Sequence, residues 1–136
     1  MPQEPASAQV VRRYYAAFNA GDRPAMLALL AETVAHDVNQ GPRETGKAAF
    51  AAFLARMDQC YREQLVEMVI MAAGDRVAAE FVVEGSYLQA DDGLPPAHGQ
   101  RYRLPAGAFF SLEAGLITRV TTYYNLADWL RQVGEG

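Results

Sequence analysis

The sequence predicts an α+β fold in which three N-terminal helices pack against a curved, antiparallel or mixed sheet. Apolar residues recur at helical spacing in the first half of the chain, whereas the second half contains long strand-like segments joined by turns. Helices that precede a run of strands usually cover one face of an antiparallel sheet. A strongly curved sheet covered in this way encloses a cone-shaped cavity, which is the default ligand site.

Apolar stripes define the helices. The stripe of the first helix consists of Val10, Val11, Tyr14, Tyr15 and Phe18. We expect Ser7 to cap this helix. Asp22 is expected to cap a second, shorter helix, whose first turn suits Pro24. The stripe of the third helix, which follows Thr45 and Gly46, consists of Phe50, Phe53, Leu54, Met57 and Tyr61.

Strand-like segments follow a different pattern, rich in β-branched and aromatic residues. We expect strands over 33–39, 65–73, 77–88, 100–112 and 116–126. Residues 89–99 form a loop, and Pro105 indicates a bulge or a sheet edge within its strand. A last short helix over 128–133 is expected to pack Trp129, Leu130 and Val133 inward.

Length and composition limit the class of protein. The 136 residues suit one domain, expected over 7–136, after a Pro- and Ala-rich disordered segment over 1–6. Hydrophobic residues make up 51% and charged residues 21% of the chain, as in an ordinary globular protein. The net charge of -4 argues against nucleic acid as a partner and against an anionic membrane surface.

Localisation follows from what the sequence lacks. There is no run of about 18 apolar residues, so no transmembrane helix is expected. The N-terminus does not look like a secretory signal. A single cysteine, Cys60, fits a reducing compartment, and we therefore expect a cytoplasmic protein. His36 and His98 have no partner at ligand spacing, so we expect no metal.

Asp37 is the leading candidate for chemistry. It shares one strand face with Ala35 and Asn39. We expect this face to line the cavity, with His36 and Val38 on the opposite face. A carboxylate in an apolar pocket has a raised pKa and can act as a general base. The alternative is a solvent-facing Asp37 that caps a turn near the end of the strand.

Tyr14 is the second candidate, because a phenol on a cavity-facing helix can donate a hydrogen bond to a substrate oxygen. Tyr15 points about 100° away, so at most one of the two tyrosines aims at the centre of the cavity. The alternative is that both are core aromatic residues. Glu84 is a candidate second acid in the pocket, although an ion-pair network with Arg103 explains it more simply.

Several segments resemble known proteins. Residues 10–22, with the sequence VVRRYYAAFNAGD, are similar to the first helix of the ketosteroid isomerases, and the match continues through 33–37 and 42–46. Residues 122–130, TYYNLADWL, resemble the C-terminal end of SnoaL-like proteins. Both groups, which include the SnoaL-like polyketide cyclases, belong to the superfamily similar to nuclear transport factor 2.

This resemblance implies a cone-shaped α+β barrel that forms a homodimer through its open sheet and needs no cofactor. In the isomerases, an aspartate moves a proton beside a ketone, while a tyrosine and a protonated aspartic acid stabilise the oxyanion. Carried over, the base is Asp37 and the oxyanion tyrosine is Tyr14. The second acid falls on Gly107, which has no side chain. The replacement donor would then come from Asn39, Tyr123 or Asn125.

The leading hypothesis is therefore an isomerase or a polyketide cyclase-like lyase that binds a small apolar carbonyl compound. Besides Asp37 and Tyr14, the residues expected at the substrate are Tyr15, Phe18, Asn39, Phe53, Met57, Val82, Glu84, Phe109, Tyr123 and Asn125. The alternative is a non-catalytic module of the same fold that binds a ligand or serves only to dimerise.

Overall fold

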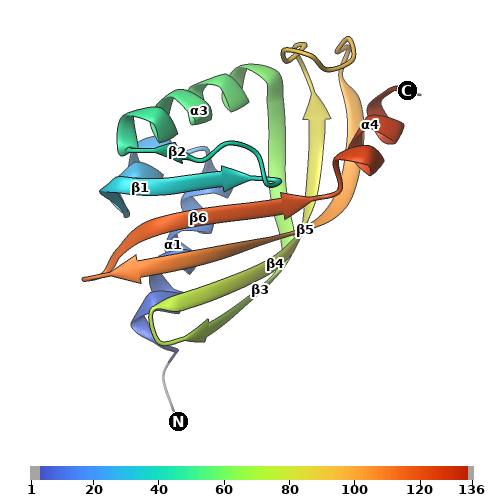
Figure 1. Ribbon diagram of the computed structural model, residues 1–136. Helices are drawn as coiled ribbons and strands as arrows, with labels where there is room; N and C mark the ends of the chain where they lie inside the picture. The colour runs from blue at the N-terminus through green and yellow to red at the C-terminus, as the bar shows by residue number, and fades with distance from the viewer. Residues whose placement is uncertain (1–3, 135–136) are drawn as a thin grey trace.

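A computed structural model of the chain describes residues 4–134, which form four helices and one six-stranded sheet (Figure 1). The helices are α1 (Ala6–Ala20), α2 (Arg23–Ala28), α3 (Lys47–Cys60) and α4 (Leu126–Gly134). The strands are β1 (Leu30–Val38), β2 (Glu44–Thr45), β3 (Tyr61–Ala73), β4 (Arg76–Tyr87), β5 (Gln100–Glu113) and β6 (Leu116–Tyr124). The predicted α+β class is confirmed. Of the expected disordered segment over 1–6, residues 1–3 lie outside the described residues, and Ala6 already belongs to α1.

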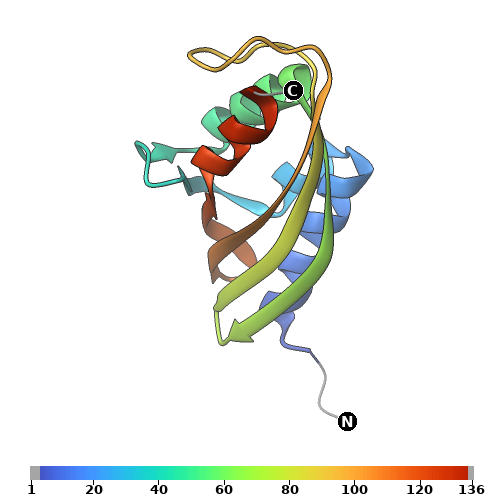
Figure 2. The ribbon, with the colours of Figure 1, turned by 90° about the vertical axis from the view of Figure 1, so that its right-hand side faces the viewer.

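The sheet is mixed. Its strand order is β2-β1-β6-β5-β4-β3, with β1 parallel to β6 and every other neighbouring pair antiparallel. Figure 2 shows the long strands bending around α1, while α3 and α4 lie at one end of the curved sheet. The sheet therefore has a concave face toward the helices and a convex face that the described helices leave uncovered.

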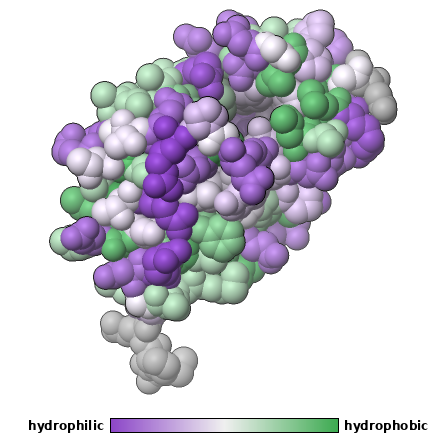
Figure 3. All heavy atoms as spheres, in the orientation of Figure 1, coloured by the Kyte–Doolittle hydropathy of each residue, from purple (hydrophilic) through white to green (hydrophobic). Residues whose placement is uncertain are grey.

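Alternation along the strands separates these two faces. The concave side of β5 carries Tyr102, Leu104, Ala106, Ala108, Phe110 and Leu112, all of them buried. Each intervening residue points to the convex side, where Phe109 is 46% exposed. Figure 3 shows the convex face as a mixture of hydrophilic and hydrophobic residues. The main core thus lies between the concave face and the helices.

The N-terminal helices form largely as predicted. Val11 is fully buried in the stripe of α1, and Gly21 ends this helix in the left-handed conformation. Asp22 caps α2 by accepting a hydrogen bond from the backbone N–H of Ala25, as expected. The prediction that Ser7 caps α1 is wrong, because the Ser7 hydroxyl donates instead to the carbonyl of Gly74 in the β3–β4 turn.

Element boundaries differ from prediction at one point that matters for the site. Tyr61 was expected in the stripe of the third helix, but α3 ends at Cys60 and Tyr61 begins β3. The strand therefore starts four residues earlier than predicted. Pro105 pairs with β4 only, because the pairing of β5 with β6 begins at Ala106. Pro105 therefore lies on a free edge of β5, as predicted.

The C-terminal helix α4 lies at the same end of the curved sheet as α3 and packs against β5 (Figure 2). Trp129 and Val133 are buried as expected, whereas Leu130 is 36% exposed, so its predicted inward orientation is wrong. Among residues 4–134, no helix has the length and apolar character needed to cross a membrane.

Candidate functional site

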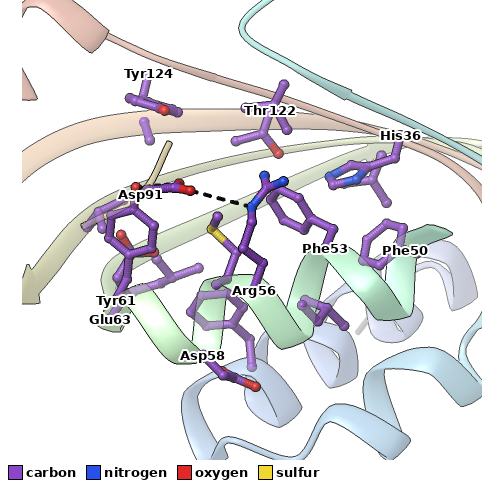
Figure 4. A pocket seen from close by; sticks show the side chains of 18 of the residues that line it. His36, Phe50, Phe53, Arg56, Asp58, Tyr61, Glu63, Asp91, Thr122 and Tyr124 are labelled. Carbon is purple, nitrogen blue, oxygen red and sulfur yellow. Dashed lines mark hydrogen bonds and ion pairs between the residues drawn. The ribbon is translucent and has the colours of Figure 1, made fainter. Parts of the chain in front are cut away.

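The concave face and the helices enclose a cavity of about 370 Å³. Its walls are mainly aromatic and aliphatic, and its aromatic residues are Tyr14, Tyr15, Phe18, His36, Phe50, Phe53, Tyr61, Phe81, Tyr102, Tyr124 and Trp129. Polar side chains reach it at a few points only, chiefly from α3, β3 and the loop between β4 and β5 (Figure 4). A mostly apolar cavity with a few convergent polar groups is typical of a small-molecule site.

Glu63 is a partly buried carboxyl group in the lining of this cavity. It lies on the concave side of β3, and the Tyr102 hydroxyl donates a hydrogen bond to its Oε2 at 2.5 Å. Burial raises the pKa of Glu63, because desolvation disfavours the charged form more than the Tyr102 hydrogen bond favours it. A carboxyl with a raised pKa in an apolar pocket is suited to general acid–base chemistry.

Gly85 makes the Glu63–Tyr102 contact possible. It is the register partner of Glu63 on β3 and of Tyr102 on β5, so it stands between them in the same cross-strand row. A Cβ at this position would lie 2.5 Å from the Tyr102 ring and hydroxyl. The missing side chain lets the Tyr102 ring cross β4 and reach the carboxyl group.

Asp91 holds the β4–β5 loop against the mouth of the cavity. The Tyr61 hydroxyl donates to Asp91 Oδ2 at 2.9 Å, and the Arg56 Nε lies 3.7 Å from Asp91 Oδ1 (Figure 4). The Tyr87 hydroxyl accepts from the Asp91 backbone N–H and donates to the carbonyl of Pro95. The loop is therefore fastened to the strands at several points.

Tyr14 and His36 are further polar side chains of the walls. Within residues 4–134, neither the Tyr14 hydroxyl nor the His36 ring has a hydrogen-bond partner. Burial raises the pKa of Tyr14, so its phenol stays protonated and able to donate. His36 stacks on Phe50 at 4.3 Å between ring centroids, and burial lowers its pKa, which favours neutral imidazole. Among these described residues, no cluster of three or more His, Cys, Asp or Glu side chains could hold a metal.

A family model for the SnoaL-like domain matches residues 11–120. The chain belongs to the SnoaL-like domain family. A candidate polyketide cyclase from Pseudomonas putida KT2440 is 58% identical and superposes with a TM-score of 0.93 over 96% of this chain and 99% of that one. A second, from Xanthomonas campestris pv. campestris, is 59% identical, with a TM-score of 0.90 over 93% and 96%.

The fold also extends to more distant relatives of this SnoaL-like chain. A protein from Burkholderia pseudomallei K96243, similar to nuclear transport factor 2 and of unknown function, is 19% identical and has a TM-score of 0.82. That match covers 96% of this chain and 98% of the other, and it supports the cone-shaped architecture. No curated protein matches the chain.

The SnoaL-like cavity contains only part of the predicted site. The predicted residues that line it are Tyr14, Tyr15, Phe18, Phe53 and Met57. Those on the convex face are Asp37, Val82, Glu84, Phe109 and Tyr123. Asn39 and Asn125 also lie outside the cavity and bond the backbone, Asn39 to the N–H of Tyr124 and Asn125 to that of Asp128. The predicted placement of these seven residues in the cavity is therefore wrong.

The expected orientation of Asp37 is wrong as well. His36 and Val38 face the cavity, so Asp37 points to the convex side. There it accepts two hydrogen bonds from the Arg43 guanidinium, at 2.8 and 2.9 Å, and one from the Thr121 hydroxyl at 2.7 Å. The Arg43 pair lowers the pKa of Asp37 to about 2, the opposite of what a general base requires.

The corrections for Asp37, Val82, Glu84, Phe109 and Tyr123 have the same cause, because in each strand the prediction assigned the wrong face to the cavity. Successive side chains alternate between faces, so a register chosen one residue off moves a whole set to the wrong side. Glu84 accordingly pairs with Arg103 on the convex face, which was the simpler alternative. Gly107 also points away from the cavity, between its partners Glu80 and Tyr123. The lack of a side chain at Gly107 therefore removes nothing from the site.

Sequence reasoning missed Glu63, Tyr102, Arg56 and Asp91. Tyr61, Glu63 and Leu65 all face inward, and they alternate with the exposed Arg62 and Gln64, which is a strand signal. That signal was obscured because Tyr61 also extends the apolar stripe of α3. Nothing in the local sequence marks Asp91, which reaches the cavity only because the long loop folds back over its mouth.

Proposed function

We propose that this SnoaL-like protein binds a small apolar carbonyl compound in its cavity and catalyses a cofactor-free proton transfer of isomerase or cyclase type. The observation that carries the proposal is the Glu63 carboxyl, buried in an apolar cavity with a raised pKa and held by Tyr102. The similarity to candidate polyketide cyclases supports the same class of chemistry.

In the proposed reaction, the Glu63 carboxylate takes a proton from the carbon beside the carbonyl group. The bond electrons move onto the carbonyl oxygen and form an enolate. The Tyr14 hydroxyl, whose hydrogen-bonding capacity is unused among the described residues, donates to that oxygen. Glu63 then returns the proton to a second carbon of the enolate. In the cyclase variant, the enolate carbon instead attacks a second carbonyl carbon of the same molecule, the electrons of that carbonyl move onto its oxygen, and Glu63 returns the proton to the alkoxide formed. Tyr102 positions Glu63 throughout.

The test is deuterium incorporation beside the carbonyl of 2-tetralone, followed by NMR in D₂O. We expect exchange above the buffer rate with the wild type and none with Glu63→Gln, which keeps the shape but cannot take a proton. Asp37→Asn is the matched control, because it neutralises a carboxylate on the convex face, and it should keep the wild-type rate. Loss of one oxyanion donor in Tyr14→Phe should slow exchange by roughly 100-fold.

A non-catalytic ligand-binding module is the competing proposal, and the same experiment separates the two. If the wild type and Glu63→Gln bind 2-tetralone equally and neither exchanges deuterium faster than buffer, the catalytic proposal is contradicted. A double-bond migration assay with a β,γ-unsaturated 3-ketosteroid then asks whether the substrate is a steroid. Migration lost in Glu63→Gln would support an isomerase.

We also propose that the protein forms a homodimer through its convex face. Exposed apolar residues support this, namely Val69, Met71, Phe109 and Tyr123. Analytical ultracentrifugation should show a dimer for the wild type and a monomer for Phe109→Asp. A monomeric wild type at micromolar concentration would contradict the proposal.

A further inference from the structure

Arg56 contributes a guanidinium to the lining of the cavity, with its side chain 55% exposed. The hydrogen-bonding capacity of this guanidinium is largely unused among the described residues. It extends from α3 toward Thr122 on β6 (Figure 4). Its one ionic contact among the described residues is the 3.7 Å approach of Nε to Asp91, and no hydrogen bond from its terminal amino groups is present there. The guanidinium lies 5.6 Å from the centre of the Phe53 ring, which supports its position.

Two arginines near the ends of this cavity and of β1, Arg23 and Arg43, have closer ionic partners than Arg56 has. Arg23 binds Asp58 with contacts of 2.7–3.1 Å, and Arg43 binds Asp37 with both branches of its guanidinium. In both pairs the planar guanidinium binds the two oxygens of a carboxylate. Arg56 forms no such pair among the described residues, so its guanidinium can bind a carboxylate of a ligand.

The acidic residues around the cavity are already engaged elsewhere. Asp58 pairs with Arg23, and the Glu63 carboxyl accepts from the Tyr102 hydroxyl while burial raises its pKa. Asp91 receives the Tyr61 hydroxyl on one oxygen and the Asp92 backbone N–H on the other, so it does not depend on Arg56. The remaining carboxylate, Glu44, is exposed at the rim.

Two further polar side chains line the cavity together with Arg56. Thr122 faces it from β6, and His36 lies between Thr122 and Phe50 in the close-up view (Figure 4). Within residues 4–134, neither the Thr122 hydroxyl nor the His36 ring has a hydrogen-bond partner. Arg56 on α3 and Thr122 and His36 on the sheet therefore contribute, to the lining of a mainly apolar cavity, donors that have no hydrogen-bond partner among the described residues.

We propose that Arg56, with Thr122, forms a subsite for a carboxylate on the ligand, so that the substrate is an apolar carbonyl compound that also carries an acid group. Arg56 binds the carboxylate through its terminal amino groups, and the Thr122 hydroxyl donates to it from the opposite wall. The apolar body of the ligand then extends toward Glu63 and Trp129. This inference rests on the proposed function for the location of the ligand, and it adds the ligand's charge.

The test compares binding of 2-naphthoate and of its neutral isostere 2-naphthamide by isothermal titration calorimetry. The wild type should prefer the carboxylate by about tenfold or more, as one charged hydrogen-bonded contact implies. Arg56→Met keeps the aliphatic stem and should bind the two probes equally, with unchanged naphthamide affinity. Thr122→Val should lose a few-fold in naphthoate affinity only.

Two variants make the test specific. Arg62→Met removes the same charge from an exposed residue on the convex side of β3 and should retain the full preference. Asp91→Asn removes the competing carboxylate while keeping an acceptor for Tyr61, and it should bind naphthoate more tightly than the wild type does. A preference that survives in Arg56→Met, or is lost equally in Arg62→Met, would overturn the subsite.

The outcomes also separate this inference from the proposed function. If the wild type binds both probes without preference yet exchanges deuterium into 2-tetralone, only the carboxylate subsite is overturned. If naphthoate is preferred but Glu63→Gln exchanges deuterium like the wild type, only the catalytic proposal fails. Absence of binding for both probes would overturn the subsite and would also leave the cavity without its proposed class of ligand.

Discussion

Glu63 and Asp37 are carboxylates on opposite faces of one sheet, and their surroundings shift them in opposite directions. Glu63 lies on the concave face, where burial raises its pKa and one tyrosine donates to it. Asp37 lies on the convex face, where the Arg43 guanidinium and Thr121 lower its pKa to about 2. The same functional group is thus prepared for proton transfer on one side and for a permanent ion pair on the other.

This comparison shows that the environment, more than residue type, decides which carboxyl can act as a base. Asp37 stands where the resemblance to the isomerases places the catalytic aspartate, yet its orientation gives it a structural contact. Glu63 stands in no recognised motif but meets the physical requirements of a buried general acid–base. The predictions below test the difference between the two faces.

The largest difference is expected for two adjacent phenylalanines of β5. Phe110 is fully buried on the concave face, whereas Phe109 is 46% exposed on the convex face. Phe110→Ala should lower the free energy of unfolding by about 3–5 kcal/mol, because it leaves a cavity in the core. Phe109→Ala should change it by less than about 0.5 kcal/mol in the monomer. Urea denaturation of both variants measures this, and similar losses would contradict the assignment of faces.

Gly85→Ala should have the next largest effect. The new methyl group would collide with the Tyr102 ring, and relieving this overlap should cost about 1–3 kcal/mol of folding free energy. Since Tyr102 must move away from Glu63, deuterium exchange into 2-tetralone should fall as well. Gly107→Ala is the control, since its Cβ would approach only the Ala79 carbonyl, at 3.4 Å on the convex side. Equal effects of the two substitutions would contradict the proposed role of Gly85.

The two carboxylates should also give stability profiles of opposite sign against pH. The lowered pKa of Asp37 stabilises the fold at pH values above 3.8, the ordinary pKa of this group. This stabilisation is lost as the pH falls through about 2. Asp37→Asn should therefore cost roughly 1 kcal/mol near neutral pH, since solvent screens the half-exposed Arg43, and almost nothing in strong acid.

Glu63 is expected to show the reverse. Because the pKa of Glu63 is raised, its contribution to the stability of the fold is complete at pH values below 4.5, the ordinary pKa of this group. The contribution is lost as the pH rises through the folded-state pKa. Glu63→Gln should match the wild type in acid and exceed its stability at alkaline pH. Thermal melting across a pH series measures both variants. Parallel profiles for the two variants would contradict the contrast between the faces.

The smallest effect is expected for Glu84→Gln. Its carboxylate pairs with Arg103 on the exposed convex face, so its removal should leave 2-naphthoate and 2-tetralone affinities unchanged. Surface ion pairs of this kind contribute little to stability. A measurable change in ligand affinity would place Glu84 nearer to the cavity than its register allows.

Much of the architecture was determined by the sequence alone. Local patterns that depend on neighbouring residues predict the stripe around Val11, the Asp22 cap and the strand edge at Pro105. They also predict the order of helices and strands except for the two-residue strand β2, which sequence reasoning missed. Tyr14, Phe53 and Met57 were placed in the cavity correctly, because a helix has one apolar side and that side must be buried.

The identity of the acid was decided by the tertiary structure. Whether Asp37 or His36 faces inward depends on how β1 pairs with β2 and β6, and a shift of one residue reverses every side chain. The Glu63–Tyr102 contact joins two strands across the missing side chain of Gly85, and Asp91 meets Arg56 only after the loop folds back. These contacts join residues far apart in the chain, so local periodicity contains no information about them.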